Sequence, residues 1–268
     1  MMKFENAKKF GMVIDLDKCT GCGACMVACM AENNVPFRED NTDKLLSVAW
    51  MRVYRLTNGK PFPDTEECFL PRPCQQCEGH AGHSPCVSVC PATATDYDMD
   101  IGIVSQIYTR CFGCRYCMAA CPYHVRQFNW WDPVWPDGME KSLNPNVSVR
   151  MRGIVEKCSF CIHRYQLAKE KAYGEGRRDL EEDEYQTACT QACPAAAITF
   201  GDLNNPKHAV YQIARPDNKH EGKSKNPNAF RLLERLGTNT KVYYLSSREW
   251  VRRAGDNYLK KETKVKHT

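Results

Sequence analysis

The chain has 268 residues, of which 43% are hydrophobic, and a formal net charge of +5 at pH 7. This balance indicates a globular protein of one or two domains and excludes a disordered or nucleic-acid-coating chain. No apolar stretch approaches the roughly 18 residues that a spanning helix needs, and residues 1–16 show no secretory signal, so we expect no membrane span. The unusual feature is the presence of 17 cysteines.

A predicted strand over residues 10–16 precedes the first of four cysteine quartets. This quartet has the spacing C-x2-C-x2-C-x3-C and consists of Cys19, Cys22, Cys25 and Cys29. The spacing is typical of bacterial ferredoxins, in which three thiolates on one loop bind one cubane and the fourth cysteine binds a neighbouring cluster. We expect the C-x3-C step to open a helix. Zinc is a poor alternative, because three cysteines at such short steps cannot all turn toward one ion.

The second quartet is interrupted by an insert and would by itself also fit a zinc site. It consists of Cys74, Cys77, Cys86 and Cys90. The insert contains His80 and His83. We expect both to face solvent, because a Rieske centre replaces cysteines by histidines and this quartet keeps its four thiols. The remaining cysteine, Cys68, is expected to be a small buried residue.

A predicted strand over residues 101–109 leads into the third quartet, which repeats the spacing of the first. Its members are Cys111, Cys114, Cys117 and Cys121. Aromatic residues crowd this quartet, namely Phe112, Tyr116, Tyr123, Phe128, Trp130, Trp131 and Trp135. Two interpretations stay open: these residues form an ordinary core, or they form a docking surface beside a partner.

A further strand is predicted over residues 147–155, where apolar and polar residues alternate, and it leads into the fourth quartet. This quartet consists of Cys158, Cys161, Cys189 and Cys193. Residues 174–185 within its long insert are expected to be a solvated excursion. A return strand is predicted over residues 196–201.

Residues 215–268 are rich in lysine and arginine. This surplus indicates either a solvated face or docking on an acidic partner or anionic lipid. Nucleic acid is not expected as a partner, because no recognition helix or aromatic-basic interleaving accompanies the charge.

The quartets predict an α+β fold of two ferredoxin-like 2[4Fe-4S] modules, one nested inside the other, with a C-terminal extension. Sequence distance favours pairing the second quartet with the third, which leaves the first to pair with the fourth. We therefore predict an outer module in residues 1–67 plus 150–205, an inner module in residues 68–149, and a basic C-terminal extension in residues 206–268.

The chain lacks a nucleophile motif, a glycine-rich nucleotide loop and a convincing pair of acid–base carboxylates. These absences from the sequence favour a non-catalytic electron-transfer subunit over a catalytic one. The alternatives are a free-standing polyferredoxin, the electron-transfer subunit of a formate dehydrogenase or hydrogenase, and a zinc scaffold.

A family resemblance rests on the motifs DKCTGC (17–22), CFGCRYC (111–117), CPY (121–123), EKCSFC (156–161), CTQACP (189–194), RLLERLGT (231–238) and VYYL (242–245). The chain resembles, over nearly its whole length, the four-cluster electron-transfer subunit of the molybdopterin oxidoreductase family, such as those of dimethyl sulfoxide and polysulfide reductases. Residues 130–141 and the NPNV sequence at 144–147 look most like the iron–sulfur subunits of alternative complex III and the Qrc menaquinone reductase.

The resemblance implies four clusters with crossed ligation. The implied ligand sets are Cys19, Cys22, Cys25 and Cys193; Cys29, Cys158, Cys161 and Cys189; Cys74, Cys77, Cys86 and Cys121; and Cys90, Cys111, Cys114 and Cys117. Some relatives lack the cysteine that matches Cys114 and hold a three-iron cluster there, whereas this chain keeps it. We therefore predict four [4Fe-4S] clusters, with a [3Fe-4S] cluster at the Cys90/Cys111/Cys114/Cys117 site as the alternative.

The resemblance also implies partners and a location. The Cys19 cluster would face a molybdopterin-type subunit and the Cys111 cluster a quinone-binding integral membrane subunit, with a multihaem cytochrome c as a further partner. The chain would be held peripherally on the periplasmic face of the cytoplasmic membrane, in menaquinone-linked anaerobic respiration. A cytoplasmic location is the alternative.

Overall fold

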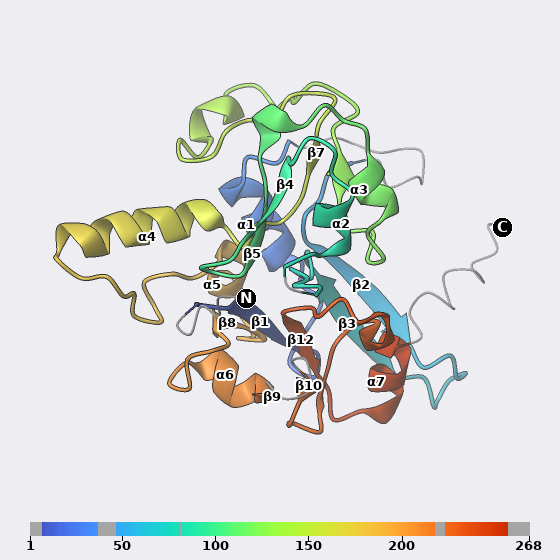
Figure 1. The fold of residues 1–268 in the computed structure, drawn as a ribbon. Helices are drawn as coiled ribbons and strands as arrows, with labels where there is room; N and C mark the ends of the chain where they lie inside the picture. Colours follow the sequence, from blue (N-terminus) through green and yellow to red (C-terminus); the bar gives the residue numbers. More distant parts are fainter. Residues whose placement is uncertain (1–6, 37–46, 81, 218–222, 257–268) are drawn as a thin grey trace.

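The computed structural model describes residues 7–36, 47–80, 82–217 and 223–256. Its main sheet has the strand order β11-β12-β1-β8 (Figure 1). These strands are β1 (Phe10–Asp15), β8 (Ile198–Asp202), β11 (Ala229–Phe230) and β12 (Val242–Leu245). Strand β1 is antiparallel to β8 and parallel to β12, and Met12 lies opposite both Phe200 and Val242. The sheet therefore joins the beginning of the chain to two segments near its end.

Four two-stranded antiparallel ribbons accompany this sheet within the described residues. They pair β2 (Arg52–Thr57) with β3 (Glu67–Arg72), β4 (Thr95–Asp98) with β5 (Ile103–Gln106), β6 (Gln127–Phe128) with β7 (Val155–Glu156), and β9 (Pro216–Asp217) with β10 (Lys223–Ser224). The β6–β7 pair brings the segment after the third quartet beside the segment that leads into the fourth.

Four of the helices stand at the C-x3-C steps, as the sequence predicted. They are α1 (Ala24–Glu32), α2 (Pro85–Ser88), α3 (Tyr116–Ala119) and α5 (Ala188–Gln191). The other helices are α4 (Ile162–Gly174), α6 (Ala209–Ala214) and α7 (Glu249–Asp256), with 3-10 turns at Tyr108–Arg110, Met139–Ser142 and Glu234–Leu236. Helix α4 extends away from the rest of the molecule (Figure 1). The chain returns from it through residues 174–185, which were predicted to be solvated, but this segment ends with Tyr185 buried in the core.

The predicted strands over residues 10–16 and 196–201 are confirmed by β1 and β8. The strand predicted over residues 101–109 is shorter than expected, because β5 ends at Gln106 and a 3-10 turn follows.

The strand predicted over residues 147–155 is wrong, since only Val155 and Glu156 are extended and paired there. Burial is the reverse of the expected pattern: Val149 and Met151 are exposed, whereas Arg150 is only 2% exposed. The Arg150 side chain forms an ion pair with Glu156 and donates to the Asn34 carbonyl oxygen at 2.9 Å. These side-chain contacts replace the ladder that a strand would have made.

The core contains cysteines as well as aliphatic and aromatic side chains. Phe10, Tyr185 and Phe200 pack edge to face or stacked, with ring centroids 4.8–5.8 Å apart. Cys68 is 2% exposed, and His80 and His83 are exposed, as predicted. The α+β class is confirmed, and the C-terminal extension contributes β12 to the main sheet. The nested modules and their boundaries stay predictions. Within the described ranges, no helix has the length and apolar character to cross a bilayer.

Candidate iron–sulfur sites

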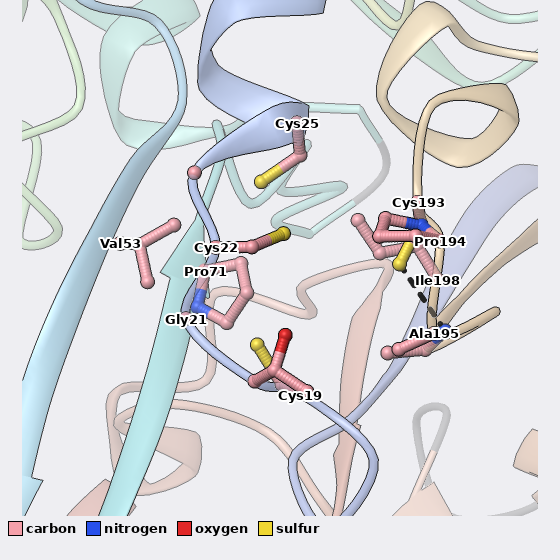
Figure 2. Close-up of a pocket in the computed structure, with 13 residues that line it drawn as sticks. Cys19, Gly21, Cys22, Cys25, Val53, Pro71, Cys193, Pro194, Ala195 and Ile198 are labelled. Atoms are coloured by element: carbon pink, nitrogen blue, oxygen red, sulfur yellow. Dashed lines mark hydrogen bonds between the residues drawn. The ribbon is translucent and has the colours of Figure 1, made fainter.

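Four cysteines surround a cavity at the end of β1, and we call them the Cys19 group. The cavity is lined by Cys19, Cys22 and Cys25 from one loop and by Cys193 from the segment before β8. In Figure 2 the four sulfur atoms face a common space, with Pro71, Pro194 and Ile198 around it. The main sheet explains the meeting, because β1 and β8 are hydrogen-bonded neighbours and carry the two segments to the same edge.

Glycine and backbone amides shape this cavity. Gly21 has φ +73°, and a Cβ placed on it would lie 2.6 Å from the Phe69 ring, so only glycine allows this close approach. The Ala197 amide donates to the Cys193 sulfur at 3.3 Å. Burial, together with the neighbouring cysteines, raises the pKa of the Cys25 thiol to about 11.

A second cavity repeats this geometry, and its cysteines form the Cys90 group. It is lined by Cys90, Cys111, Cys114 and Cys117. The Ala94 amide donates to the Cys90 sulfur at 3.2 Å, and the Val155 amide donates to the Cys111 sulfur at 3.5 Å. Gly113, the counterpart of Gly21, has φ +77°, and a Cβ there would lie 2.0 Å from the Gly153 carbonyl oxygen.

The Cys29 group is buried in the core. Its members Cys29, Cys158, Cys161 and Cys189 are each no more than 8% exposed. Burial, followed by the charges that Cys158, Cys161 and Cys189 would carry, raises the pKa of the Cys29 thiol well above its ordinary value. The four sulfur atoms therefore lie close enough together that each opposes ionisation of the others.

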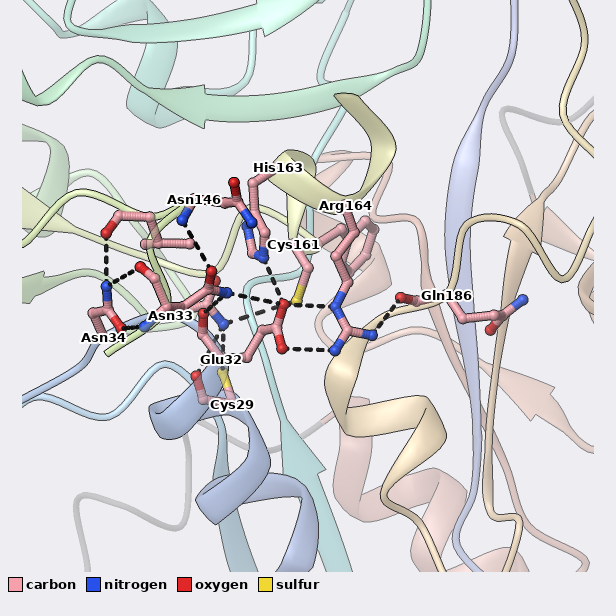
Figure 3. Close-up of polar contacts among 12 residues, drawn as sticks. Cys29, Glu32, Asn33, Asn34, Asn146, Cys161, His163, Arg164 and Gln186 are labelled. Atoms are coloured by element: carbon pink, nitrogen blue, oxygen red, sulfur yellow. Dashed lines mark hydrogen bonds and ion pairs between the residues drawn. The ribbon is translucent and has the colours of Figure 1, made fainter. Parts of the chain in front are cut away.

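A polar network surrounds the Cys29 group (Figure 3). Asn33 Nδ2 lies 3.8 Å from the sulfur atoms of both Cys29 and Cys161. The preceding residue, Glu32, accepts two hydrogen bonds of 2.6 Å from Arg164 and contacts His163 Nε2 at 2.6 Å. These contacts lower the pKa of Glu32, although burial opposes the shift. The network fastens α1, which carries Cys29, to α4, which follows Cys161.

The Cys74 group consists of Cys74, Cys77, Cys86 and Cys121. Burial, followed by the charges of the other three members, raises the pKa of the Cys77 thiol well above its ordinary value. Cys86 differs, because its pKa is lowered: burial opposes ionisation, but Arg126, Ser84 and Lys157 outweigh it. Cationic side chains therefore act on this group.

The four groups follow one another in space. Cys25 and Cys29 lie on the same helix, α1, which joins the Cys19 group to the Cys29 group. Burial is the largest cause that raises the pKa of Cys158, and the charge that Cys74 would carry is the second largest. The Cys74 group therefore lies beside the Cys29 group. Burial is the largest cause that raises the pKa of Cys117, and Cys86 raises it further. The Cys90 group therefore lies beside the Cys74 group, at the end of the row opposite the Cys19 group. The order is Cys19 group, Cys29 group, Cys74 group, Cys90 group.

These surroundings fit polynuclear iron–sulfur clusters. Buried thiols with raised pKa values are costly to ionise, and coordination to iron would remove this cost because a metal-bound thiol is deprotonated outright. Backbone amides already point at the sulfur atoms of Cys90, Cys111, Cys158 and Cys193, as they do around clusters. In the part of the chain that the structure describes, no three ligands converge closely enough for a single metal ion.

Sequence reasoning identified every cysteine of these groups but missed the residues that support them. Glu32 and Asn33 lie three and four residues after Cys29, a helical spacing that places them near it, yet nothing in the sequence indicated that Arg164 would meet Glu32 across 132 positions. Lys241 was likewise missed. It is 1% exposed, and burial lowers its pKa to about 7 despite the opposing effect of Glu78.

Comparison with known proteins gives consistent matches. Residues 10–31 match the 4Fe-4S binding domain family. The chain is 60% identical to the menaquinone reductase iron–sulfur cluster-binding subunit of Nitratidesulfovibrio vulgaris, over 99% of this chain and 100% of that protein.

More distant relatives extend the match. The chain is 36% identical to the iron–sulfur subunit of a putative dimethyl sulfoxide reductase of Halobacterium salinarum, over 88% of this chain and 79% of that protein. It is 35% identical to an Hdr-like menaquinol oxidoreductase iron–sulfur subunit of Archaeoglobus fulgidus, over 88% and 83% respectively.

Proposed function

Because this chain belongs to the family of iron–sulfur electron-transfer subunits of menaquinone reductase and related respiratory reductases, we propose that its four cysteine groups hold four [4Fe-4S] clusters in one relay. The observation that carries the proposal is the spatial order of the four groups, in which each lies beside the next. Single electrons would pass between partner subunits through this chain, which itself performs no catalysis.

The proposed ligand sets are the four groups themselves. In each set three cysteines come from one quartet and the fourth comes from another, which is the crossed ligation of two-cluster ferredoxins. The Cys19 and Cys29 groups exchange their fourth cysteines, Cys193 and Cys29, and the Cys74 and Cys90 groups exchange Cys121 and Cys90. This exchange supports two nested modules, with the inner one inserted between the halves of the outer one.

Each cluster supplies one-electron chemistry when bound, and the chain determines where it sits and what surrounds it. The apolar core around Cys29, Cys158 and Cys189 excludes water. Amide donors such as the Phe160 amide, 3.4 Å from the Cys158 sulfur, would stabilise the more negative reduced state. The side chains thus hold the relay dry and set its potentials.

Exposure supports an assignment of the two ends of the proposed relay. Cys22 of the Cys19 group and Cys114 of the Cys90 group are exposed, whereas no cysteine of the two middle groups is. We propose that the Cys19 end receives a molybdopterin-type subunit and that the Cys90 end faces a quinone-binding membrane subunit. A multihaem cytochrome c is the further partner, and the location is the periplasmic face of the membrane.

The surface beside Cys114 supports a protein partner at that end. Phe112 is 66% exposed and Tyr116 is 58% exposed, and both stand within two residues of Cys114 in the chain. Exposed apolar side chains gathered around one site favour association. Replacing Phe112 and Tyr116 by serine should therefore release the membrane partner.

The test combines spectroscopy with copurification from native membranes. The reduced complex should give signals of four clusters assigned to this chain, and the Phe112→Ser/Tyr116→Ser variant should keep them while losing the membrane subunit. The matched control is Leu167→Ser. Leu167 is an exposed residue of α4 that lies at neither end of the relay, so this variant should keep the membrane subunit. A double variant that loses clusters but keeps its partner would contradict the proposed end.

A further inference from the structure

A single buried arginine lies between the Cys74 group and the Cys90 group. Arg126 is 4% exposed and stands just before β6. Its Nη1 donates to Gln106 Oε1 at 2.9 Å, and Gln106 Oε1 also accepts from Thr95 Oγ1 at 2.9 Å. Gln106 lines the cavity of the Cys90 group. One edge of the guanidinium is therefore fixed by a neutral amide.

The other nitrogens of Arg126 have no partner of their own. Nε and Nη2 are buried without a hydrogen-bond acceptor among the described residues. The guanidinium lies near enough to the thiols of Cys86 and Cys117 for its charge to act on both. Because Cys86 belongs to the Cys74 group and Cys117 to the Cys90 group, one cation acts on a ligand of each proposed cluster.

A buried cation needs a compensating negative charge. The charged neighbours that act most strongly on Arg126 are the thiols of Cys86, Cys117 and Cys74. Thiolates bound to a cluster would provide the compensation. The arginine in turn favours the more negative, reduced form of whichever cluster it adjoins.

The other end of the relay is different. Between the Cys19 group and the Cys29 group lies helix α1, and the side chains close to the sulfur atoms of the Cys29 group are neutral. Thr187 Oγ1 lies 3.2 Å from the Cys189 sulfur and Asn33 Nδ2 lies 3.8 Å from the Cys29 sulfur. Arg164 already makes two hydrogen bonds to the carboxylate of Glu32, so its charge is matched. The buried Lys157 ammonium donates to the backbone carbonyl oxygens of Val104 and Cys158.

We infer that Arg126 is a positioning residue of the relay, whose fixed charge raises the reduction potentials of the Cys74 and Cys90 clusters together. This inference rests on the proposed function, since it requires clusters at both sites. It divides the relay into a pair of clusters of higher potential and a pair, at the Cys19 and Cys29 groups, without this contribution.

The test is a redox titration of the full-length, cluster-loaded chain, followed by electron paramagnetic resonance. In Arg126→Gln the reduction equilibrium constants of two clusters should fall at least about tenfold, which is about 59 mV for a one-electron couple. The other two should stay unchanged. Arg126→Lys keeps the charge, so its reduction potentials should stay close to those of the wild-type chain. Arg115→Gln is the matched control, because Arg115 lines the cavity of the Cys90 group but is exposed to water. Its removal should change the potentials less than the removal of Arg126.

A second variant changes the charge without touching the arginine. Gln106→Glu keeps an acceptor for Arg126 and adds a carboxylate that matches its charge, so the same two potentials should fall. Unchanged potentials in both variants, or an equal fall of all four, would overturn the inference. Loss of clusters in both variants would also overturn it, by making Arg126 a structural anchor. A wild-type chain without four cluster signals would instead contradict the proposed function.

Discussion

The two middle cysteine groups and the two terminal ones lie in opposite environments. The Cys29 group is entirely buried, and the Cys74 group has no exposed member. The Cys19 and Cys90 groups each place the second cysteine of the C-x2-C-x2-C loop at the surface, namely Cys22 and Cys114. In every quartet a C-x3-C helix directs the last cysteine to the neighbouring group, which links the terminal groups to the middle ones. The chain thus combines openings to partners with an insulated interior.

The largest expected effect comes from removing a buried ligand. Cys158→Ala should abolish the Cys29 cluster and destabilise the fold, because Cys158 is buried between two groups and lies in the largest core cluster. Cys22→Ala should cost at most one terminal cluster. Iron content and thermal unfolding of the two variants measure the contrast. Equal losses in both would remove the distinction between middle and terminal groups.

Metal removal should sharpen the same comparison. A chelator with an oxidant should strip iron in two phases, because water reaches the cavities at Cys22 and Cys114 before it reaches the core. The fast phase should carry about half of the iron of a four-cluster chain. Iron release followed together with the cluster spectra tests this, and a single phase that bleaches all clusters together is the contrary outcome.

A smaller effect is expected from the network that holds the Cys29 group. Glu32→Gln removes the charge that binds Arg164 and His163 and should destabilise the fold by about 2 kcal/mol. The temperature of cluster loss should then fall by about 4–8 °C. The control is Glu67→Gln, which breaks an exposed ion pair with Arg55 and should leave that temperature unchanged. An equal fall in both variants would count against a special role of the network.

The smallest effect concerns the terminal Cys19 loop. Gly23 has φ +78°, but a Cβ there would meet nothing within 4 Å, so Gly23→Ala should cost only about 1 kcal/mol from backbone strain. Gly21→Ala, in the same loop, adds a clash with Phe69 and should cost more. Thermal unfolding of the two loaded variants ranks them, and the reverse ranking would contradict the close packing described for this loop.

The sequence allowed good prediction of what is local and poor prediction of what is not. The helices at the four C-x3-C steps and the strands β1 and β8 follow from spacing and apolar runs. The 147–155 segment misled because Arg150, not its apolar neighbours, turns inward to Glu156. Helix α4 was missed because its Leu167 and Tyr173 are exposed, which leaves no clear apolar stripe.

Pairing across the chain was also beyond local patterns. The parallel contact of β12 with β1 joins Met12 to Val242, and the contact of Glu32 with Arg164 also joins distant segments. The cysteine quartets were an exception, because their chemistry requires partners and so constrains distant segments. Arg126 lies only five residues after Cys121 in the sequence, but its place between two cysteine groups follows from the fold.

The central claim is that four polynuclear clusters form one relay in this chain. Iron and acid-labile sulfide analysis of the anaerobically purified chain, combined with Mössbauer spectroscopy, tests it most directly. The account predicts about sixteen irons with matching sulfide, all in [4Fe-4S] environments. Zinc in place of iron, or iron sufficient for only one or two clusters in a fully loaded preparation, would contradict it.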